Sequence, residues 1–128
     1  MATLRQIYFI LLFILILFKN VHAEPISGNL VFLHVLDKVT SRVDVIEIQV
    51  GEIVEFASLR IEILLCKSRP PEEVPEDFVL LKIDDRISQE NYETVFQGWM
   101  ISSSPAVTPL EHPIYDLWLK DCKINKDL

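Results

Sequence analysis

The stretch 59-LRIEILLC-66 alternates apolar and polar side chains with a period of two residues. Its apolar positions are Leu59, Ile61, Ile63 and Leu65, and its polar positions are Arg60 and Glu62. A β-strand turns successive side chains to opposite faces, so this pattern is typical of a strand with one buried face. We therefore expect a β-strand that ends at Cys66.

Two strand-like segments precede this stretch. Residues 30–36 form a continuous apolar run broken only by His34, which is typical of a central strand with both faces buried. Residues 43–50 are rich in β-branched side chains, which favour strands. Their alternation changes phase near Val45 and Ile46, which predicts a β-bulge at that point.

A tight turn is expected between residues 43–50 and residues 53–56. Gly51-Glu52 places a glycine first in a two-residue connection, a form that suits tight hairpin turns. The sequence therefore predicts that these two segments pair with each other as a hairpin.

Three more strand-like segments follow, separated by polar loops. They cover residues 78–83, 94–101 and 114–121. Residues 67–77 and 102–113 are long loops with three prolines each, and proline cannot join a sheet ladder. The chain thus contains about seven short strands and little helix, which predicts an all-β domain, either a small sandwich or a barrel. The periodicity leaves both open.

The start of the chain has the three parts of a secretory signal peptide. Arg5 supplies a positive end, residues 7–18 are apolar, and Val21 and Ala23 suit the recognition pocket of signal peptidase. We expect cleavage between Ala23 and Glu24. The alternative is an uncleaved anchor that residues 7–18 hold in the inner membrane, although a spanning helix needs about 20 apolar residues.

The expected layout has four parts. These are a cleaved signal helix at 1–23, a lead-in with the start of the first strand at 24–34, a compact β domain at 35–122 and a flexible tail at 123–128. An exported form of this length has room for one modest core. We therefore expect a single exported domain.

The acidic charge balance excludes one class of partner. The full chain has 12 basic and 19 acidic residues, a net charge of −7. Removal of the signal peptide takes Arg5 and Lys19 with it, so 10 basic residues face 19 acidic ones and the net charge becomes −9. Binding to nucleic acid requires a positive field that neutralises phosphates. We expect no nucleic-acid partner.

The two cysteines, Cys66 and Cys122, form an even set in a chain that is expected to be exported. Such a set predicts a disulfide. The bond would close a loop of about 57 residues and contribute roughly 4 kcal/mol in the chain-entropy model. Two free thiols or a metal pair are the alternatives, but no C-x-x-C spacing is present.

Three strings carry a resemblance to a known family. They are 36-LDKVTSRVDVIEIQVGEIVEFASLRIEILLC-66, 66-CKSRPPEEVPEDFVLLKI-83 and 95-VFQGWMISSSPAVTPLEHPIYDLWLKDC-122. Together they resemble the alphaproteobacterial exported proteins of domain-of-unknown-function family 2155. The resemblance implies a bacterial source and a periplasmic location, with an inner-membrane anchor at residues 7–18 as the alternative. It supplies no activity.

One constellation suggests hydrolysis. Ser102, Ser103 and Ser104 precede His112 and Asp116, and serine, histidine and aspartate can form a nucleophilic triad. The chain has no G-x-S-x-G elbow, and serines in a proline-bounded loop are common turn formers. A small envelope hydrolase built from these residues is therefore the alternative function.

Metal and cofactor sites are not expected. The candidate metal ligands are His34, Glu111, His112 and Asp116. His34 shares a face with leucine and phenylalanine side chains, which is typical of a core histidine, and zinc requires three or four converging ligands. None of the three glycines lies in a phosphate-binding string. We expect neither metal nor cofactor.

The remaining candidate is a recognition surface. Two proline-rich loops and several aromatic side chains could bind a partner, since aromatic residues anchor many interfaces. The candidates are Arg69, Glu72, Glu73, Trp99, His112 and Tyr115. The sequence therefore favours a non-catalytic binding or structural module of the bacterial envelope, with another envelope protein as its partner.

Overall fold

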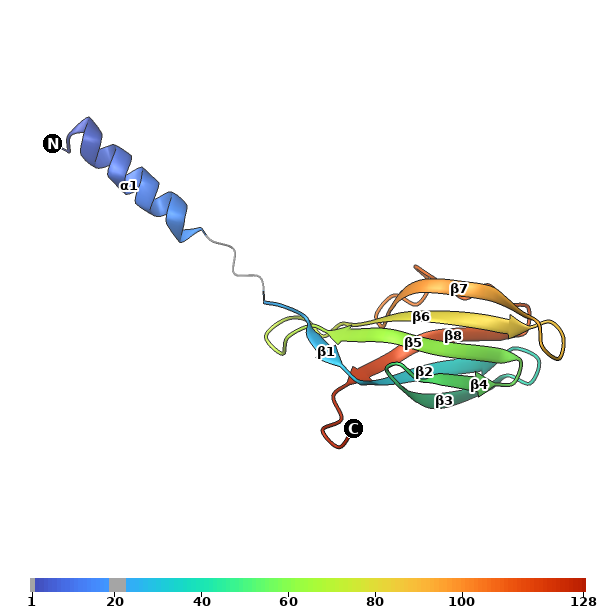
Figure 1. Ribbon diagram of the computed structural model, residues 1–128. Helices are drawn as coiled ribbons and strands as arrows, with labels where there is room; N and C mark the ends of the chain where they lie inside the picture. The colour runs from blue at the N-terminus through green and yellow to red at the C-terminus, as the bar shows by residue number, and fades with distance from the viewer. Residues whose placement is uncertain (1, 19–22) are drawn as a thin grey trace.

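The computed structural model describes residues 2–18 and 23–128 and shows a β-sandwich of two antiparallel sheets (Figure 1). The described elements are α1 Leu4–Leu17, β1 Ile26–Gly28, β2 Leu30–Asp37, β3 Arg42–Gln49, β4 Ile53–Phe56, β5 Leu59–Ser68, β6 Asp77–Arg86, β7 Tyr92–Ile101 and β8 Tyr115–Lys123. The all-β prediction is confirmed, and of its two forms the sandwich is the one observed. β1 is a short strand that the sequence pattern did not predict.

The larger sheet, sheet A, has the order β1-β5-β6-β7, and β4 also pairs with β5. The smaller sheet, sheet B, has the order β3-β2-β8. Both sheets contribute to one core, whose fully buried side chains include Val31, Leu33, Val35, Ile61, Ile63, Leu81 and Leu119. Inward-facing side chains of the two sheets thus interdigitate as expected for a sandwich.

The alternation in β5 is confirmed up to Ile63 and is wrong at Leu65. Leu59, Ile61 and Ile63 are fully buried. The pairing of β5 with β6 shifts between Ile63 and Leu65, so Leu64 is an extra, exposed residue. A bulge reverses the side-chain phase beyond it, and it therefore turns Cys66 into the core instead of Leu65.

The bulge predicted near Val45 and Ile46 is wrong, because β2 and β3 pair over their whole length without a shift. The change of phase has another cause. Val43 and Val45 point away from the core, whereas Ile46 and Ile48 point into it, so the strand is apolar on both faces. This double-sided pattern imitates a bulge in the sequence.

The hairpin predicted across Gly51-Glu52 is also wrong. Gly51 does adopt a positive φ of 88°, and Glu52 donates a backbone hydrogen bond to the carbonyl of Gln49. The turn, however, carries the chain from β3 in sheet B to β4 in sheet A, where β4 pairs with β5. The local turn chemistry was identified correctly, whereas the choice of partner strand depends on burial in the sandwich.

The N-terminal segment contains α1, in which no side chain is buried. Among the described residues, no helix is both long enough and apolar enough to cross a membrane. Val21 lies outside the described residues, and Ala23 is exposed just before β1. Cleavage after Ala23 stays a prediction.

Candidate functional site

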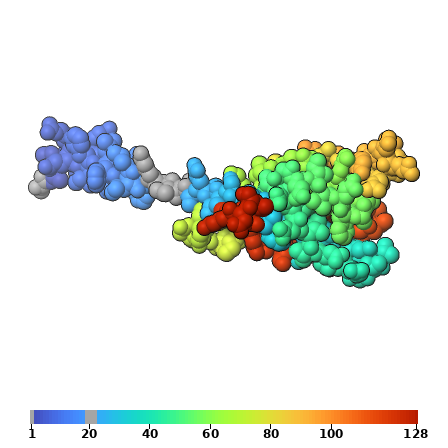
Figure 2. Space-filling view, turned by 60° about the horizontal axis from the view of Figure 1, so that its bottom comes forward, coloured from blue at the N-terminus to red at the C-terminus, as the bar shows by residue number. Residues whose placement is uncertain are grey.

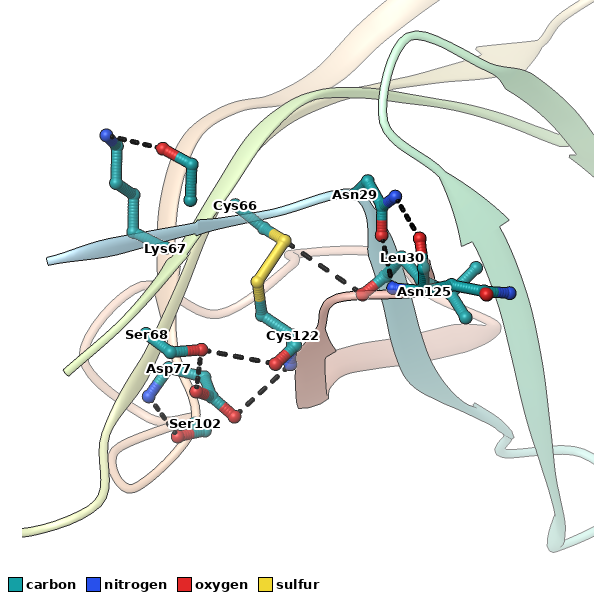
Figure 3. Close-up of a disulfide and its surroundings, with 10 residues drawn as sticks. Asn29, Leu30, Cys66, Lys67, Ser68, Asp77, Ser102, Cys122 and Asn125 are labelled. Atoms are coloured by element: carbon teal, nitrogen blue, oxygen red, sulfur yellow. Dashed lines mark hydrogen bonds between the residues drawn. A yellow bond between two sulfur atoms is a disulfide. The ribbon is translucent and has the colours of Figure 1, made fainter. Parts of the chain in front are cut away.

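One end of the sandwich is built around the cysteine pair. Cys66 lies on β5 and Cys122 on β8, and their sulfur atoms are 2.11 Å apart, at disulfide distance (Figure 3). Both side chains are buried. Because the two strands belong to different sheets, the pair links sheet A to sheet B.

Gly28 allows the chain to pass directly over the cysteine pair. It lies opposite Cys66 in the β1–β5 ladder, and the next residue, Asn29, leads from sheet A into sheet B. A Cβ atom on Gly28 would lie 2.8 Å from the sulfur of Cys66, closer still to that of Cys122, and 2.9 Å from the carbonyl oxygen of Lys123. Only glycine fits this crossing without displacing the sulfurs.

Asn29 also holds the C-terminal segment. Its amide nitrogen donates to the carbonyl oxygen of Asn125 at 2.7 Å, and its amide oxygen accepts from the Asn125 backbone nitrogen at 2.7 Å (Figure 3). The two bonds satisfy both polar groups of one side chain. They place the segment after β8 against the crossing between the sheets.

Carboxylates at the end of the first proline loop form hydrogen bonds beside the cysteine pair. Ser68 Oγ lies 2.6 Å from Asp77 Oδ1 and 3.1 Å from the Cys122 carbonyl oxygen, and the Cys122 backbone nitrogen donates to Asp77 Oδ2 at 3.2 Å (Figure 3). The Asp77 backbone nitrogen donates to Ser102 Oγ at 3.0 Å. Asp77 therefore joins β5, β8 and the loop after β7.

Ser102 and Ser103 form hydrogen bonds with the Glu76 carboxylate. Ser102 Oγ donates to Glu76 Oε1 at 2.8 Å, the Ser103 backbone nitrogen donates to the same oxygen at 2.9 Å, and the Ser103 hydroxyl donates to Oε2. Burial alone would raise the pKa of Glu76, but these hydrogen bonds outweigh it and hold the pKa below its usual value. The serines thus serve as donors to a structural carboxylate.

His112 lies at the opposite end of the sandwich. Its Nδ1 accepts from the backbone nitrogens of Ile114 and Tyr115, both at 3.1 Å, so the ring proton is on Nε2 and is donated to Asp85 Oδ2 at 2.9 Å. Burial would raise the pKa of Asp85, but hydrogen bonds from Ser58 and His112 hold it below its usual value. The side chain of His112 fastens the second proline loop to the end of β6.

The proposed hydrolytic triad is not assembled. Ser102 is bound near Asp77 and His112 near Asp85, at the two ends of β6, which implies a separation of about 25 Å. Asp116 forms an ion pair with Lys38 at 3.0 Å instead of contacting His112. The three residue types therefore have separate structural roles, and the alternative based on them is wrong.

The six predicted recognition residues do not share one surface. Trp99 lines a groove of about 310 Å³ with Pro25, Lys67 and Phe78, and the Arg69 guanidinium lies 5.9 Å from the Phe78 ring centroid. Glu72 and Glu73 are exposed in the adjoining loop. His112 and Tyr115 lie together at the other end, with ring centroids 5.3 Å apart. The role of these residues in recognition stays a prediction.

The outer face of sheet A carries a polar network. Asp84 Oδ2 lies 3.3 Å from Lys82 Nζ and 3.4 Å from Arg60 Nη2, and Thr94 Oγ1 donates to Asp84 Oδ1 at 2.8 Å. The Arg60 guanidinium stacks over the Tyr92 ring at 3.8 Å. Each strand from β5 to β7 contributes to this network, so the charged groups satisfy one another.

The outer face of sheet B has an apolar and aromatic centre, which Glu47, Asp116 and Asp121 border on the same face. We call it the sheet B face and define it by Phe32, His34, Leu36, Val43, Val45 and Trp118. His34 and Trp118 are paired across β2 and β8, and their rings stack with centroids 5.2 Å apart. Val43 and Val45 are 52% and 48% exposed on β3, the segment drawn in teal and green in Figure 2.

A groove of about 410 Å³ extends the sheet B face along β8. Its floor includes Leu36 and Trp118, and its wall is the second proline loop, with Pro105 and Pro109. Buried Leu110 fixes this loop to the core. The face and the groove together form a continuous, largely apolar area over β3, β2 and β8.

Comparison with known proteins supplies the family. Residues 31–122 match the model of a family described as "Uncharacterized protein conserved in bacteria (DUF2155)". The chain belongs to this family. The match confirms, over residues 31–122, the family resemblance found in the sequence. No solved protein structure matches the chain.

A curated relative is an uncharacterised protein of Rickettsia prowazekii (strain Madrid E). It is 32% identical over 87 residues, which cover 68% of this chain and 56% of the relative. The chain therefore spans about half the length of that relative. The family and the relative both place the protein among bacterial proteins.

Sequence reasoning missed the sheet B face and the glycine crossing, although each left a signal. The double-sided apolar pattern of residues 30–36 and 43–50 marked the face, but it was interpreted as burial and a bulge. Gly28 is one of only three glycines. Its importance depends on a sulfur pair that is distant in sequence, so no local pattern could reveal it.

Proposed function

We propose that the protein is an exported, non-catalytic binding module of the bacterial cell envelope, and that another envelope protein docks on the sheet B face. The observation that carries the proposal is the apolar character of this face. An antiparallel sheet that covers a core on one side normally turns polar side chains to water on the other. The part of sheet A around the Asp84 network follows this rule, whereas the centre of the sheet B face turns Val43, Val45 and Trp118 outward.

The free-energy cost of leaving apolar area in water supports binding of a partner protein. Apolar area costs roughly 25 cal/mol per Å² when it stays in water. Contiguous exposed apolar patches on single domains commonly mark interaction sites. Trp118 and Phe32 are the large aromatic side chains of the face, and such side chains anchor interfaces. A protein partner covers this area at a gain in free energy.

Three features support export. The N-terminal pattern of residues 1–23 is that of a signal peptide. The cysteine pair lies at disulfide distance, and stable disulfides belong to oxidising compartments such as the periplasm. The acidic net charge disfavours nucleic acid as a partner. These features together favour the envelope as the place of action.

Photocrosslinking in the native bacterium tests the proposal. A benzophenone side chain at Val43, on the sheet B face, should give a discrete crosslinked species of defined mass. A matched control carries the same group at Ile87, which is 66% exposed in the loop after β6. The proposal predicts crosslinks from Val43 only. It fails if neither site gives a specific species, or if Ile87 alone does.

A further inference from the structure

The four sheet edges of the sandwich differ in how they are protected. An edge strand exposes unpaired backbone groups, and proteins normally block such edges. On one side of sheet A the edge strands β1 and β4 have only three and four residues. On its other side Thr108 Oγ1 donates to the Trp99 carbonyl of β7 at 2.6 Å. On β8, Asp77 accepts the hydrogen bond of the Cys122 backbone nitrogen.

β3 is a regular edge strand that is covered at its end, where the Gln49 backbone nitrogen donates to Glu52 Oε2 at 3.0 Å. It has eight residues, contains neither proline nor glycine, and pairs with β2 without a register shift. In the described chain, the backbone of residues 42–48 forms no hydrogen bond beyond the ladder with β2. The outer edge of β3 thus offers a row of free donors and acceptors, next to the exposed Val43 and Val45.

The charges on β3 select the chemistry of an added strand. The strand carries Arg42, Asp44 and Glu47, a net charge of −1, within a chain of net charge −7. Val43, Val45 and Glu47 lie on the outer face of β3, and Asp44 lies on the other face. A matching segment would place apolar side chains opposite Val43 and Val45, and lysine or arginine opposite Asp44 and Glu47. Charge complementarity therefore favours a basic partner.

A second copy of β3 fits less well. In a two-fold antiparallel pair, residues of the same face lie opposite each other. A pair centred on Asp44 brings two aspartates together, and a pair centred on Val45 places Glu47 opposite Val43. The register that matches Arg42 with Asp44 pairs only residues 42–44 of each strand. No register gives a long, charge-matched homodimer.

We propose that β3 accepts an extended, lysine- or arginine-bearing segment of another envelope protein as an added strand of sheet B. This inference rests on the proposed function and names the partner's conformation and charge. The added backbone hydrogen bonds supply affinity, and contacts with Val43, Val45 and Glu47 on one face and with Asp44 on the other supply specificity.

A peptide-binding experiment with the full chain tests this mode. The probe is a fluorescent eight-residue peptide for antiparallel pairing with residues 42–49. It carries lysine at positions 3 and 6, opposite Glu47 and Asp44, valine at positions 5 and 7, opposite Val45 and Val43, and threonine elsewhere. Two derivatives carry N-methyl groups on alternate residues, one on each set, because methylation blocks one edge of a strand only. The proposal predicts that one derivative binds like the parent, and that the other loses at least about tenfold in affinity, equivalent to some 1.4 kcal/mol.

Two charge variants of the protein provide the matched control. Val45→Lys places a cation on the β3 edge and should weaken binding by about tenfold, through lost packing and like-charge repulsion. Val39→Lys makes the same change of charge in the β2–β3 turn, at a residue that is 77% exposed. It should leave the affinity unchanged. Equal urea midpoints would establish that both variants are folded.

Several outcomes would overturn strand addition. Equal binding of both methylated derivatives, or equal weakening by Val39→Lys and Val45→Lys, would indicate adhesion by charge alone. Concentration-dependent dimers abolished by Val45→Lys in sedimentation experiments would assign the edge to a second copy. If the peptide fails while Val43 still crosslinks to a protein in cells, strand addition is wrong and the binding function stands. If both fail, the binding function falls as well.

Discussion

The outer faces of the two sheets obey the same alternation but differ in chemistry. On sheet A, Asp84, Lys82, Arg60 and Thr94 satisfy one another, so this part of the face is complete in water. On sheet B, the central outward positions are apolar or aromatic, and Glu47, Asp116 and Asp121 lie around them: the central residues are Phe32, Leu36, Val43, Val45 and Trp118. Folding requires only that the inward positions be apolar. The apolar outward positions of sheet B therefore point to a requirement beyond folding.

We expect the largest change in the free energy of unfolding when the bond between the cysteines, which joins the two sheets, is removed. The double variant Cys66→Ala, Cys122→Ala should lose about 4 kcal/mol in free energy of unfolding, because the unfolded chain regains the freedom of a loop of about 57 residues. Urea unfolding of the purified protein measures this. Wild-type protein under strong reductant should show a similar loss. An unchanged midpoint in both would contradict a stabilising role for the pair.

Gly28→Ala should have the next largest effect. The added methyl group would overlap both sulfurs, and overpacking of this kind costs about 2 kcal/mol. The control is Gly51→Ala, where no atom lies within 4 Å of the added Cβ and only the positive φ is unfavourable. In the cysteine-free background the cost of Gly28→Ala should fall by more than half. Full additivity would show that the sulfurs do not cause the conflict.

The polar network of sheet A should respond to Asp84→Asn with a loss of about 1.5 kcal/mol, because the charge-assisted hydrogen bonds from Lys82 and Arg60 are weakened. Denaturant unfolding at neutral pH measures the loss. Val43→Thr with Val45→Thr, which alters sheet B only, is the control and should change stability far less.

Acidification should weaken the same network and lower the stability of the protein. Burial alone would raise the pKa of Asp84, but hydrogen bonds from Thr94 and Lys82 outweigh it and hold the pKa below its usual value of about 3.9. The stabilisation is complete above that value and is lost as pH falls through the lower pKa of the folded state. Between about pH 5 and pH 2, the wild type should therefore lose more stability than Asp84→Asn. Parallel curves would contradict the role of Asp84.

The smallest effect on stability is expected on the sheet B face. Val43→Thr with Val45→Thr keeps the β-branched shape at two half-exposed positions and should change the free energy of unfolding by less than about 0.5 kcal/mol. Recovery of the partner by co-purification should nevertheless fall strongly. A large loss of stability with normal partner recovery would show that Val43 and Val45 serve folding and not partner binding.

The sequence predicted the strands of the sandwich well, because period-two burial is a local signal. Leu59, Ile61 and Ile63 lie in the core as expected. Pairing and bulges were harder to predict. The extra residue Leu64 and the route of the chain from β3 to β4 depend on contacts between segments, which no single window contains.

Candidate sites were less predictable than strands, because polar residues take their roles from distant partners. Ser102 and His112 are ten residues apart in sequence, yet they are bound at opposite ends of β6 by Asp77 and Asp85. The prolines between them extend the loop along the sandwich. A triad that looks compact in the sequence is therefore separated in space.

The two tryptophans allow the most direct test of binding through sheet B. Trp118 belongs to the sheet B face, and Trp99 lies on the outer face of sheet A, where it is 43% exposed. Hydroxyl-radical footprinting followed by mass spectrometry would compare their oxidation in intact cells and in the purified protein. The account predicts that Trp118 is protected in cells while Trp99 reacts equally in both. Equal reactivity of Trp118 in both settings, or protection of Trp99 alone, would contradict it.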